Sequence, residues 1–232
     1  MLAGTRMIIQ SLPDISNYKA SIIQQDLKSQ NHTISSLNDY EVVRGNMIHP
    51  TAIINWSEIT IGNGNIIGPF VCIGTEPQHK KLTSNGKISI GNDNVFREYS
   101  TVHLPTSLDS ETKIGNRNYF MVNAHVAHDC TLEDNIVMCN NASLAGHVHI
   151  MHGASLALNC SIHQFQVIGS WSMVGMNSCV SKSSKISPGR TFFGVPAKYI
   201  GRNRIALERH QVTDDQLVAE TERFDALWMK RL

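Results

Sequence analysis

The sequence predicts an all-β fold, a β-helix of hexapeptide repeats. Three observations predict it. An aliphatic or aromatic residue recurs at every sixth position, small or polar residues often follow it, and aromatic (6%) and charged (17%) residues are few, as suits a thin aliphatic-filled coil. A period of six fits neither a helix nor simple strand alternation. The repeat positions are Ile114, Phe120, Val126, Leu132, Met138, Leu144, Ile150, Leu156, Ile162, Ile168, Val174, Val180, Ile186 and Phe192.

The repeat also predicts which side chains meet. Three hexads make one triangular coil, so residues eighteen positions apart stack in a column. Neighbours in a column are one strand spacing apart, roughly 4.8 Å. The linear sequence therefore becomes a map of contacts along each edge of the coil.

The remaining elements follow in order. Residues 1–46 lack the repeat, and we interpret them as an N-terminal cap or accessory segment, with a short amphipathic helix over residues 16–30. The β-helix is predicted over residues 47–196. Residues 197–232 are predicted to form short C-terminal helices, because Thr213–Gln216 reads as a capping box before a final helix.

Two polar segments interrupt the repeat. They are Thr75–Lys87, which contains Pro and Gly, and Leu104–Lys113. Insertions in a repeat array form loops on one face, which is often the binding face. We therefore expect both loops to lie beside a functional site.

Composition excludes several classes of function. A net charge of +1, with no block of Lys or Arg, gives no electrostatic case for nucleic-acid binding. The five cysteines are odd in number and lack metal-ligand spacing, which favours free thiols in a reducing compartment. Neither a transmembrane-length apolar run nor a secretion signal is present, so we expect a soluble cytoplasmic protein without a transmembrane segment.

A histidine-rich stretch in the middle of the array suggests acyl transfer. His128, Gly146 and Gln164 are eighteen apart and are predicted to stack. Histidine is a general base near neutral pH, and a glycine N–H can stabilise an oxyanion. Asp129 can fix the imidazole tautomer. The alternative is that these histidines are solvent-facing turn residues without a function.

Several motifs are specific to one family. The chain resembles the acyl-carrier-protein-dependent UDP-N-acetylglucosamine acyltransferases of lipid A synthesis over about residues 48–212. The most specific match is the run from Asn123 to Cys130, which reads NAHVAHDC. The other matching segments are Ile48–Ala52, Gly68–Phe70, Asn140–Val148, Ile162–Phe165, Ile200–Asn203 and Leu207–Arg209.

The resemblance implies an architecture and roles for single residues. It implies a left-handed parallel β-helix, an exception to the right-handed crossover rule, assembled as a homotrimer with active sites between subunits. His128 would be the general base, Asp129 its support, and the Gly146 amide the oxyanion donor. The substrate-binding residues that it implies are Gln78, Lys81, His125, His147, His163, Gln164, Asn203 and Arg209.

The chain also departs from the family pattern. His79 replaces an Asp in the loop run that begins at Gln78, which removes a carboxylate acceptor from the expected sugar site. Leu104 and Pro105 replace the family's Arg-Gly after a histidine, His210 replaces the second Arg of a pair, and the helical tail is shorter. These changes bear on the acceptor and on the carrier-protein contact.

The acyl chain length is predicted by one further position. In the family, the residue after Val-Gly limits the length of the acyl tail, and here that residue is Met176, with the bulky Trp171 nearby. A methionine fills the volume of several methylenes, so we expect a short or medium acyl group. The alternative is that Met176 only fills a gap between subunits.

The leading hypothesis is an acyltransferase. It moves a short-to-medium (3-hydroxy)acyl group from an acyl-carrier-protein or coenzyme A thioester to the 3-hydroxyl or 3-amino group of a UDP-N-acetylhexosamine-type sugar, without a metal or other cofactor. The acceptor, the donor and the pathway, lipid A or surface polysaccharide, stay open.

Two other functions are alternatives. A zinc enzyme like the hexapeptide carbonic anhydrases would use His147 and His152, which are five apart, with His103 or His128. The other alternative is a non-catalytic trimer that binds a nucleotide sugar.

Overall fold

The computed structural model describes residues 39–80 and 86–231. The helix predicted over residues 16–30, most of the predicted cap and the predicted substrate-binding Lys81 lie outside the described residues. From Tyr40 onward the chain forms one compact unit.

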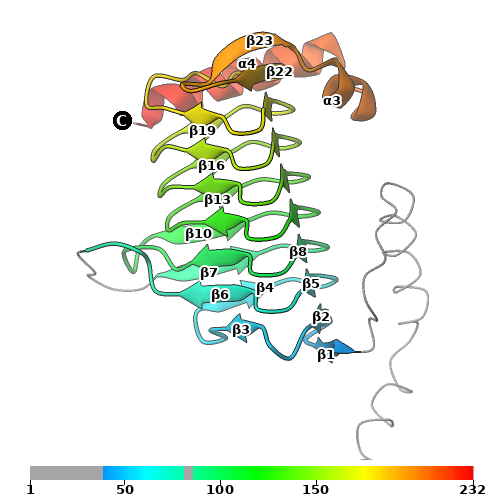
Figure 1. Cartoon of the computed structure of the whole chain (residues 1–232), viewed down its shortest axis with the longest axis vertical. Helices are drawn as coiled ribbons and strands as arrows, with labels where there is room; N and C mark the ends of the chain where they lie inside the picture. The colour runs from blue at the N-terminus through cyan, green and yellow to red at the C-terminus, as the bar shows by residue number, and fades with distance from the viewer. Residues whose placement is uncertain (1–38, 81–85, 232) are drawn as a thin grey trace, which may run out of the picture. The chain divides into compact units, whose positions relative to one another are not determined.

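The architecture is a left-handed parallel β-helix whose successive short strands join three sheets in turn (Figure 1). Sheet 1 holds β1 (Glu41–Val43), β2 (Asn46–Ile48), β5 (Ile66–Ile67), β8 (Val95–Phe96), β11 (Tyr119–Phe120), β14 (Val137–Met138), β17 (Ser155–Leu156), β20 (Met173–Val174), β22 (Arg190–Phe193) and β23 (Lys198–Arg202). Sheet 2 holds β3 (Ile53–Ile54), β6 (Cys72–Thr75), β9 (Thr101–His103), β12 (His125–Val126), β15 (Ser143–Leu144), β18 (Ser161–Ile162) and β21 (Cys179–Val180). Sheet 3 holds β4 (Ile59–Ile61), β7 (Lys87–Ile90), β10 (Glu111–Ile114), β13 (Thr131–Leu132), β16 (His149–Ile150) and β19 (Val167–Ile168).

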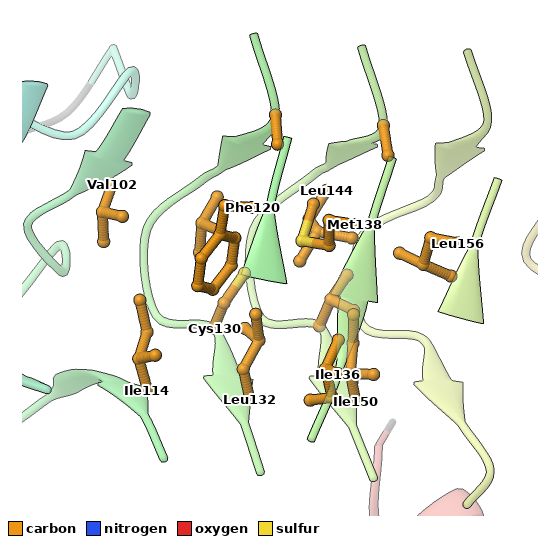
Figure 2. Close-up of a cluster of buried hydrophobic side chains, with 14 of the residues drawn as sticks. Val102, Ile114, Phe120, Cys130, Leu132, Ile136, Met138, Leu144, Ile150 and Leu156 are labelled. Carbon is orange, nitrogen blue, oxygen red and sulfur yellow. The ribbon is translucent and has the colours of Figure 1, made fainter. Parts of the chain in front are cut away.

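The register confirms the predicted columns. Val126 pairs with Leu144, Leu144 with Ile162 and Ile162 with Val180, each eighteen residues further along the chain. The repeat residues point inward and fill the coil (Figure 2), and Phe120 and Leu132 are among those fully buried. Each such side chain contributes about 1.5–3 kcal/mol by leaving water, so the core fixes the register that aligns the corner residues.

The turns between sheets 2 and 3, here called the 2–3 corner, use a recurring backbone conformation. Asp129, His147 and Phe165 are eighteen apart and all have positive φ, at 60°, 61° and 60°. A left-handed residue turns the chain sharply, and three consecutive coils each place one at this corner. Backbone bonds from His147 N to His128 O and from Phe165 N to Gly146 O then hold the corner residues in register along the axis.

Both ends of the coil are closed by antiparallel pairs. β1 pairs with β2 at the first coil, and β23 pairs with β22 at the last. The tail was predicted as helices alone, and β23 precedes them. The helices are α3 (Arg204–Arg209) and α4 (Asp214–Lys230), and α4 begins with the predicted capping box, whose Thr213 and Gln216 bonds are both present.

The tail folds back against the coil. Phe224 of α4 is fully buried and packs against Met151 and Val167, while Leu207 of α3 packs against Trp171. The tail thereby covers the last coils of sheet 3 (Figure 1). Within residues 39–80 and 86–231, no helix is long and apolar enough to cross a lipid bilayer.

Candidate active site

His128 and Asp129 form an imidazole–carboxylate pair at the 2–3 corner. The Nδ1 atom of His128 is 2.8 Å from the Oδ2 atom of Asp129. The two side chains are only 11% and 5% exposed, so their interaction is sheltered from water. Within the described part of the chain, the Nε2 atom of His128 has no hydrogen-bond partner, which leaves it free to accept a proton.

The second insertion supports Asp129. Thr106 donates to the Asp129 carboxylate from its hydroxyl (2.9 Å) and from its backbone N–H (3.2 Å). Burial alone would raise the pKa of Asp129, but hydrogen bonds from Ser110, His128 and Thr106 outweigh it and hold the pKa below its usual value. Asp129 is therefore a carboxylate at neutral pH, which fits a role in orienting His128.

Gly146 leaves room for the His128 ring. A Cβ on Gly146 would lie 2.6 Å from Nε2 of His128 and 2.8 Å from its Nδ1, so any other residue would displace the imidazole. Among the backbone bonds of residues 39–80 and 86–231, none uses the Gly146 N–H as a donor. A free N–H one coil from the base suits an oxyanion.

His147 continues the corner toward the tail. Its Nε2 is 3.7 Å from Asp129 Oδ2, and its ring stacks on Phe165 with centroids 4.5 Å apart. Burial lowers the pKa of His147, Asp129 partly offsets this, and His128 and His79 lower it further. The ring is therefore largely neutral near pH 7 and able to accept or donate a hydrogen bond.

His125 lies in sheet 2, just before the corner. Its Nδ1 is 2.8 Å from the Thr101 hydroxyl, and its ring centroid is 5.1 Å from that of His103. Burial, with smaller contributions from His103 and His128, lowers the pKa of His125 to about 4. His125 is therefore a polar, uncharged side chain near pH 7.

The first insertion reaches the same corner. His79, which replaces the family's Asp, has its ring centroid 5.7 Å from that of His128 in the same chain. Gln78 precedes it and is exposed. The His79 substitution, which departs from the family pattern, therefore lies beside the candidate base His128.

His163 and Gln164 lie further along the corner and are exposed. The Nδ1 atom of His163 is 3.0 Å from the Gln164 carbonyl oxygen. Both side chains line a cavity of about 320 Å³, whose lining residues are His163, Gln164, Phe165, Gln166, Lys182 and Arg231.

Other sequence-predicted residues lie elsewhere in the chain. Asn203 caps α3 and donates to the Trp171 carbonyl, and Arg209 is exposed in the last turn of α3. Trp171 is buried against the tail, whereas Met176 is 55% exposed at the opposite corner, between sheets 1 and 2. The structure thus gathers the residues of the 2–3 corner and leaves these four apart from them.

Only two histidines of the predicted zinc set, His128 and His147, lie close enough together to share a metal ion. Among the described residues, the ligand atoms of His128, Asp129 and His147 lie within 4.8 Å of one another. His152 belongs to a different cluster, where its Nδ1 is 3.5 Å from Glu133 and 3.7 Å from Glu220. His147 and His152 therefore have separate partners within this chain.

Sequence reasoning missed the residues that hold Asp129 in place. Thr106 and Ser110 reach it from the second insertion. The available signal was the insertion's position, since loops of a repeat array gather on one face, but its aperiodic sequence gives no register. Together the corner residues define a β-helix protein with an oriented imidazole base beside a free backbone N–H.

Comparisons with known proteins agree with this class. The chain is 37% identical over 173 residues to the acyl-[acyl-carrier-protein]–UDP-N-acetylglucosamine O-acyltransferase of Herminiimonas arsenicoxydans, which covers 74% of this chain and 65% of that protein. It is 36% identical to the enzyme of the same name from Synechocystis, over 72% of this chain and 60% of the relative. The chain thus spans less than two thirds of the length of these relatives.

Solved structures give the same result. A UDP-N-acetylglucosamine O-acyltransferase from Moraxella catarrhalis superposes with a TM-score of 0.62 at 31% identity, over 80% of this chain and 86% of that one. The UDP-N-acetylglucosamine acyltransferase from Bacteroides fragilis gives 0.68 at 29% identity, over 81% and 73%. No protein-family model matches the chain. The chain belongs to the UDP-N-acetylglucosamine acyltransferase family.

Proposed function

We propose that this chain transfers a short-to-medium (3-hydroxy)acyl group from an acyl-carrier-protein or coenzyme A thioester to a UDP-N-acetylhexosamine-type sugar. The acceptor atom is the 3-hydroxyl oxygen or the nitrogen of a 3-amino group. The observation that carries the proposal is the His128–Asp129 pair, whose imidazole is oriented through Nδ1 and free at Nε2, one coil from the unused Gly146 N–H.

Each group has a defined part in the reaction. His128 Nε2 takes the proton of the acceptor hydroxyl or amine as the acceptor atom forms a bond to the thioester carbonyl carbon. The carbonyl oxygen becomes an oxyanion, which the Gly146 N–H stabilises. Collapse of the tetrahedral intermediate breaks the carbon–sulfur bond. The leaving thiolate takes the proton from His128, whose cationic form is stabilised by the Asp129 carboxylate.

We infer further that the site is completed by a second subunit of a homotrimer. Met176 lies at a different corner from His128, so one acyl group held by both needs two copies of the chain. Leu158, eighteen residues before Met176, is also exposed (45%), which gives that corner an apolar surface for a neighbour or an acyl tail. Gln78, Lys81, Asn203 and Arg209 are proposed to contact the nucleotide sugar from such neighbouring subunits.

The acyl length follows from the same arrangement. Met176 limits the tail because its flexible side chain occupies the space that a glycine would leave open. With Met176→Gly, the preferred donor is expected to lengthen by several methylenes, and with Met176→Leu it stays short. Donor chain-length profiles measured on the two variants check this. An unchanged profile in the glycine variant would leave Met176 as a packing residue.

The test of the function is a mass-spectrometric transfer assay. The protein meets UDP-N-acetylglucosamine and its 3-amino analogue, each with acetyl and 3-hydroxyacyl thioesters of increasing length on acyl carrier protein and on coenzyme A. The proposal predicts a nucleotide sugar that gains one acyl group, and no product with His128→Gln. If neither acceptor is acylated although the nucleotide sugar still binds, the result would instead support the non-catalytic trimer.

The zinc alternative has its own readout. Metal content of the purified protein, measured before and after chelation, separates the two chemistries, because the proposed transfer needs only protein groups. If chelation abolished acyl transfer and zinc restored it, the proposed role of His128 as a free base would be contradicted.

A further inference from the structure

The cavity beyond Gln164 has an unusual charge balance. Its lining includes Lys182 and Arg231, and within the described residues neither side chain has a carboxylate partner. Partial burial lowers the pKa of Arg231 with no acid to offset it, whereas Glu133 and Glu220 raise the pKa of Arg223 on the same helix. Two cations around a cavity, without a carboxylate partner among residues 39–80 and 86–231, favour an anionic ligand.

The Arg231 side chain is held in place at the cavity. Its guanidinium carbon lies 3.2 Å from the ring centroid of Trp228, and its terminal nitrogens are 3.4 and 3.3 Å from the Lys182 carbonyl oxygen. Its Nε atom is buried and has no hydrogen-bond partner. A guanidinium held in one position can bind phosphate-like oxygens through its planar set of N–H donors.

A row of ring contacts leads from the cavity to the candidate active site. Its wall residue Phe165 stacks on His147, which in turn lies with its ring centroid 5.2 Å from that of His128. The register puts Lys182 in the column of His128, Gly146 and Gln164, three coils beyond the base. Three strand spacings amount to about 14 Å along the axis.

This separation decides between two sources of phosphate. In a UDP-sugar, only the width of the sugar ring separates the reacting 3-position from the diphosphate. In a thioester donor, an extended pantetheine arm separates the sulfur from its phosphate, and its reach is comparable to three coils. The longer span fits the donor.

We propose that Lys182 and Arg231 form a phosphate subsite that receives the 4′-phosphate of the donor's phosphopantetheine arm, with the arm lying along His147 and Phe165. This inference rests on the proposed function, because it assigns the donor of that reaction a binding path. It makes the phosphate, which both acyl carrier protein and coenzyme A carry, the group that selects donors over simple thioesters.

The test compares 4′-phosphopantetheine with pantetheine, which lacks the phosphate, by calorimetric titration of the full chain. The wild type is expected to bind the phosphorylated form roughly tenfold or more tightly, as one or two charge-assisted hydrogen bonds would give. Lys182→Gln and Arg231→Gln should each lose most of this discrimination. Lys230→Gln is the matched control, because Lys230 is exposed and neighbours Arg231 but does not line the cavity.

The outcomes separate this inference from the proposed function. Discrimination that is absent in the wild type, or that survives in both variants, overturns the subsite even if acyl transfer occurs. Discrimination that is present and lost in both variants supports the subsite, whatever the transfer assay gives. Titration with UDP is the further arm: if the variants lose UDP binding and keep phosphopantetheine binding, the cations serve the acceptor and the inference is wrong. Thermal melting checks that Arg231→Gln keeps the tail docked. Lys182 is exposed on the coil, so Lys182→Gln tests the subsite without disturbing the packing of the tail.

Discussion

Two clusters of imidazole and carboxylate groups lie on this coil, and they differ in what the carboxylate bonds to besides the imidazole. At the 2–3 corner, Asp129 binds Nδ1 of His128, and Nε2 of His128 has no partner among the described residues. Beneath α4, Glu133 accepts from Nε2 of His149 at 2.6 Å and pairs with Arg223.

The second cluster, here called the docking cluster, consists of Glu133, His149, His152, Glu220 and Arg223 and joins the coil to α4. The backbone N–H of His152 donates to Glu133 at 3.1 Å, and Glu220 of α4 accepts from the Ser170 hydroxyl at 2.5 Å and from Arg223 at 2.9 Å. Its bonds join α4 to the coil, so the cluster stabilises the tail. In the docking cluster the carboxylates bond to the tail as well as to imidazoles, whereas Asp129 bonds to His128 and to the second insertion, which leaves the 2–3 corner uncovered by α4.

The largest effect is expected from Asp129→Asn. The amide keeps the shape of the side chain but no longer stabilises the His128 cation or selects its tautomer, so kcat should fall roughly 10²- to 10⁴-fold. Steady-state kinetics and the unfolding free energy are measured together. A large loss of stability with little loss of kcat would place Asp129 with the docking cluster instead.

A smaller effect on the rate is expected from Gly146→Ala. The added Cβ would displace the His128 ring, so we expect kcat to fall roughly 10²-fold, the size of a lost acid–base or oxyanion contribution. Gly153→Ala is the matched change at the corner between sheets 3 and 1. Its added Cβ would meet Trp171, and the φ of Gly153 is +67°. That variant should lose about 1–3 kcal/mol of stability and keep its kcat. Equal losses of kcat in the two variants would show that Gly146 has no special role beside His128.

Removing the charge of the docking cluster tests its role. Glu133→Gln leaves Arg223 and His149 without their acceptor, so the unfolding free energy should fall by about 1–3 kcal/mol while kcat changes little. Chemical denaturation and acyl-transfer kinetics measure the two quantities. If kcat fell as far as in Asp129→Asn, Glu133 would belong to the catalytic machinery.

The pH dependence of the Glu133 contribution has a defined sign. Burial would raise the pKa of Glu133, but bonds from His149, His152 and Arg223 lower it far below its usual range. A lowered folded-state pKa gives stability that is complete above the unfolded value of about 4.3 and is lost as pH falls through the folded value. The stability difference between wild type and Glu133→Gln should therefore be constant from pH 7 to 5 and shrink only below about pH 4. A difference that disappeared by pH 5 would contradict this.

The smallest effect is expected at His125. Its pKa of about 4 lies below the unfolded value of roughly 6.5, so its protonation opposes folding. This cost should grow as pH falls from about 6.5 to 4 and then level off. Denaturation of wild type and His125→Gln across this range measures it. A wild type no more acid-sensitive than the variant would show that His125 is not held neutral.

The two clusters also differ in how far the sequence predicts them. The six-residue period fixes the register, and the register alone places His128, Gly146 and Gln164 in one column. The capping box at Thr213 is equally local and is present. Contacts from aperiodic segments carry no such signal. Thr106 reaches Asp129 from an insertion, and Glu220 reaches Ser170 from a tail fifty residues further on, so only the folded chain reveals them.

Nitrogen NMR of the histidine side chains can show whether Nε2 of His128 is the free base. When its ring is uncharged, His128 should carry its proton on Nδ1 and none on Nε2, because Asp129 accepts from Nδ1. His149 should show the opposite tautomer, with the proton on Nε2, because Glu133 accepts there. The same spectrum of Asp129→Asn should lose the preference at His128 alone. A proton on Nε2 of the neutral His128 ring in the wild type would show that this nitrogen is not the base.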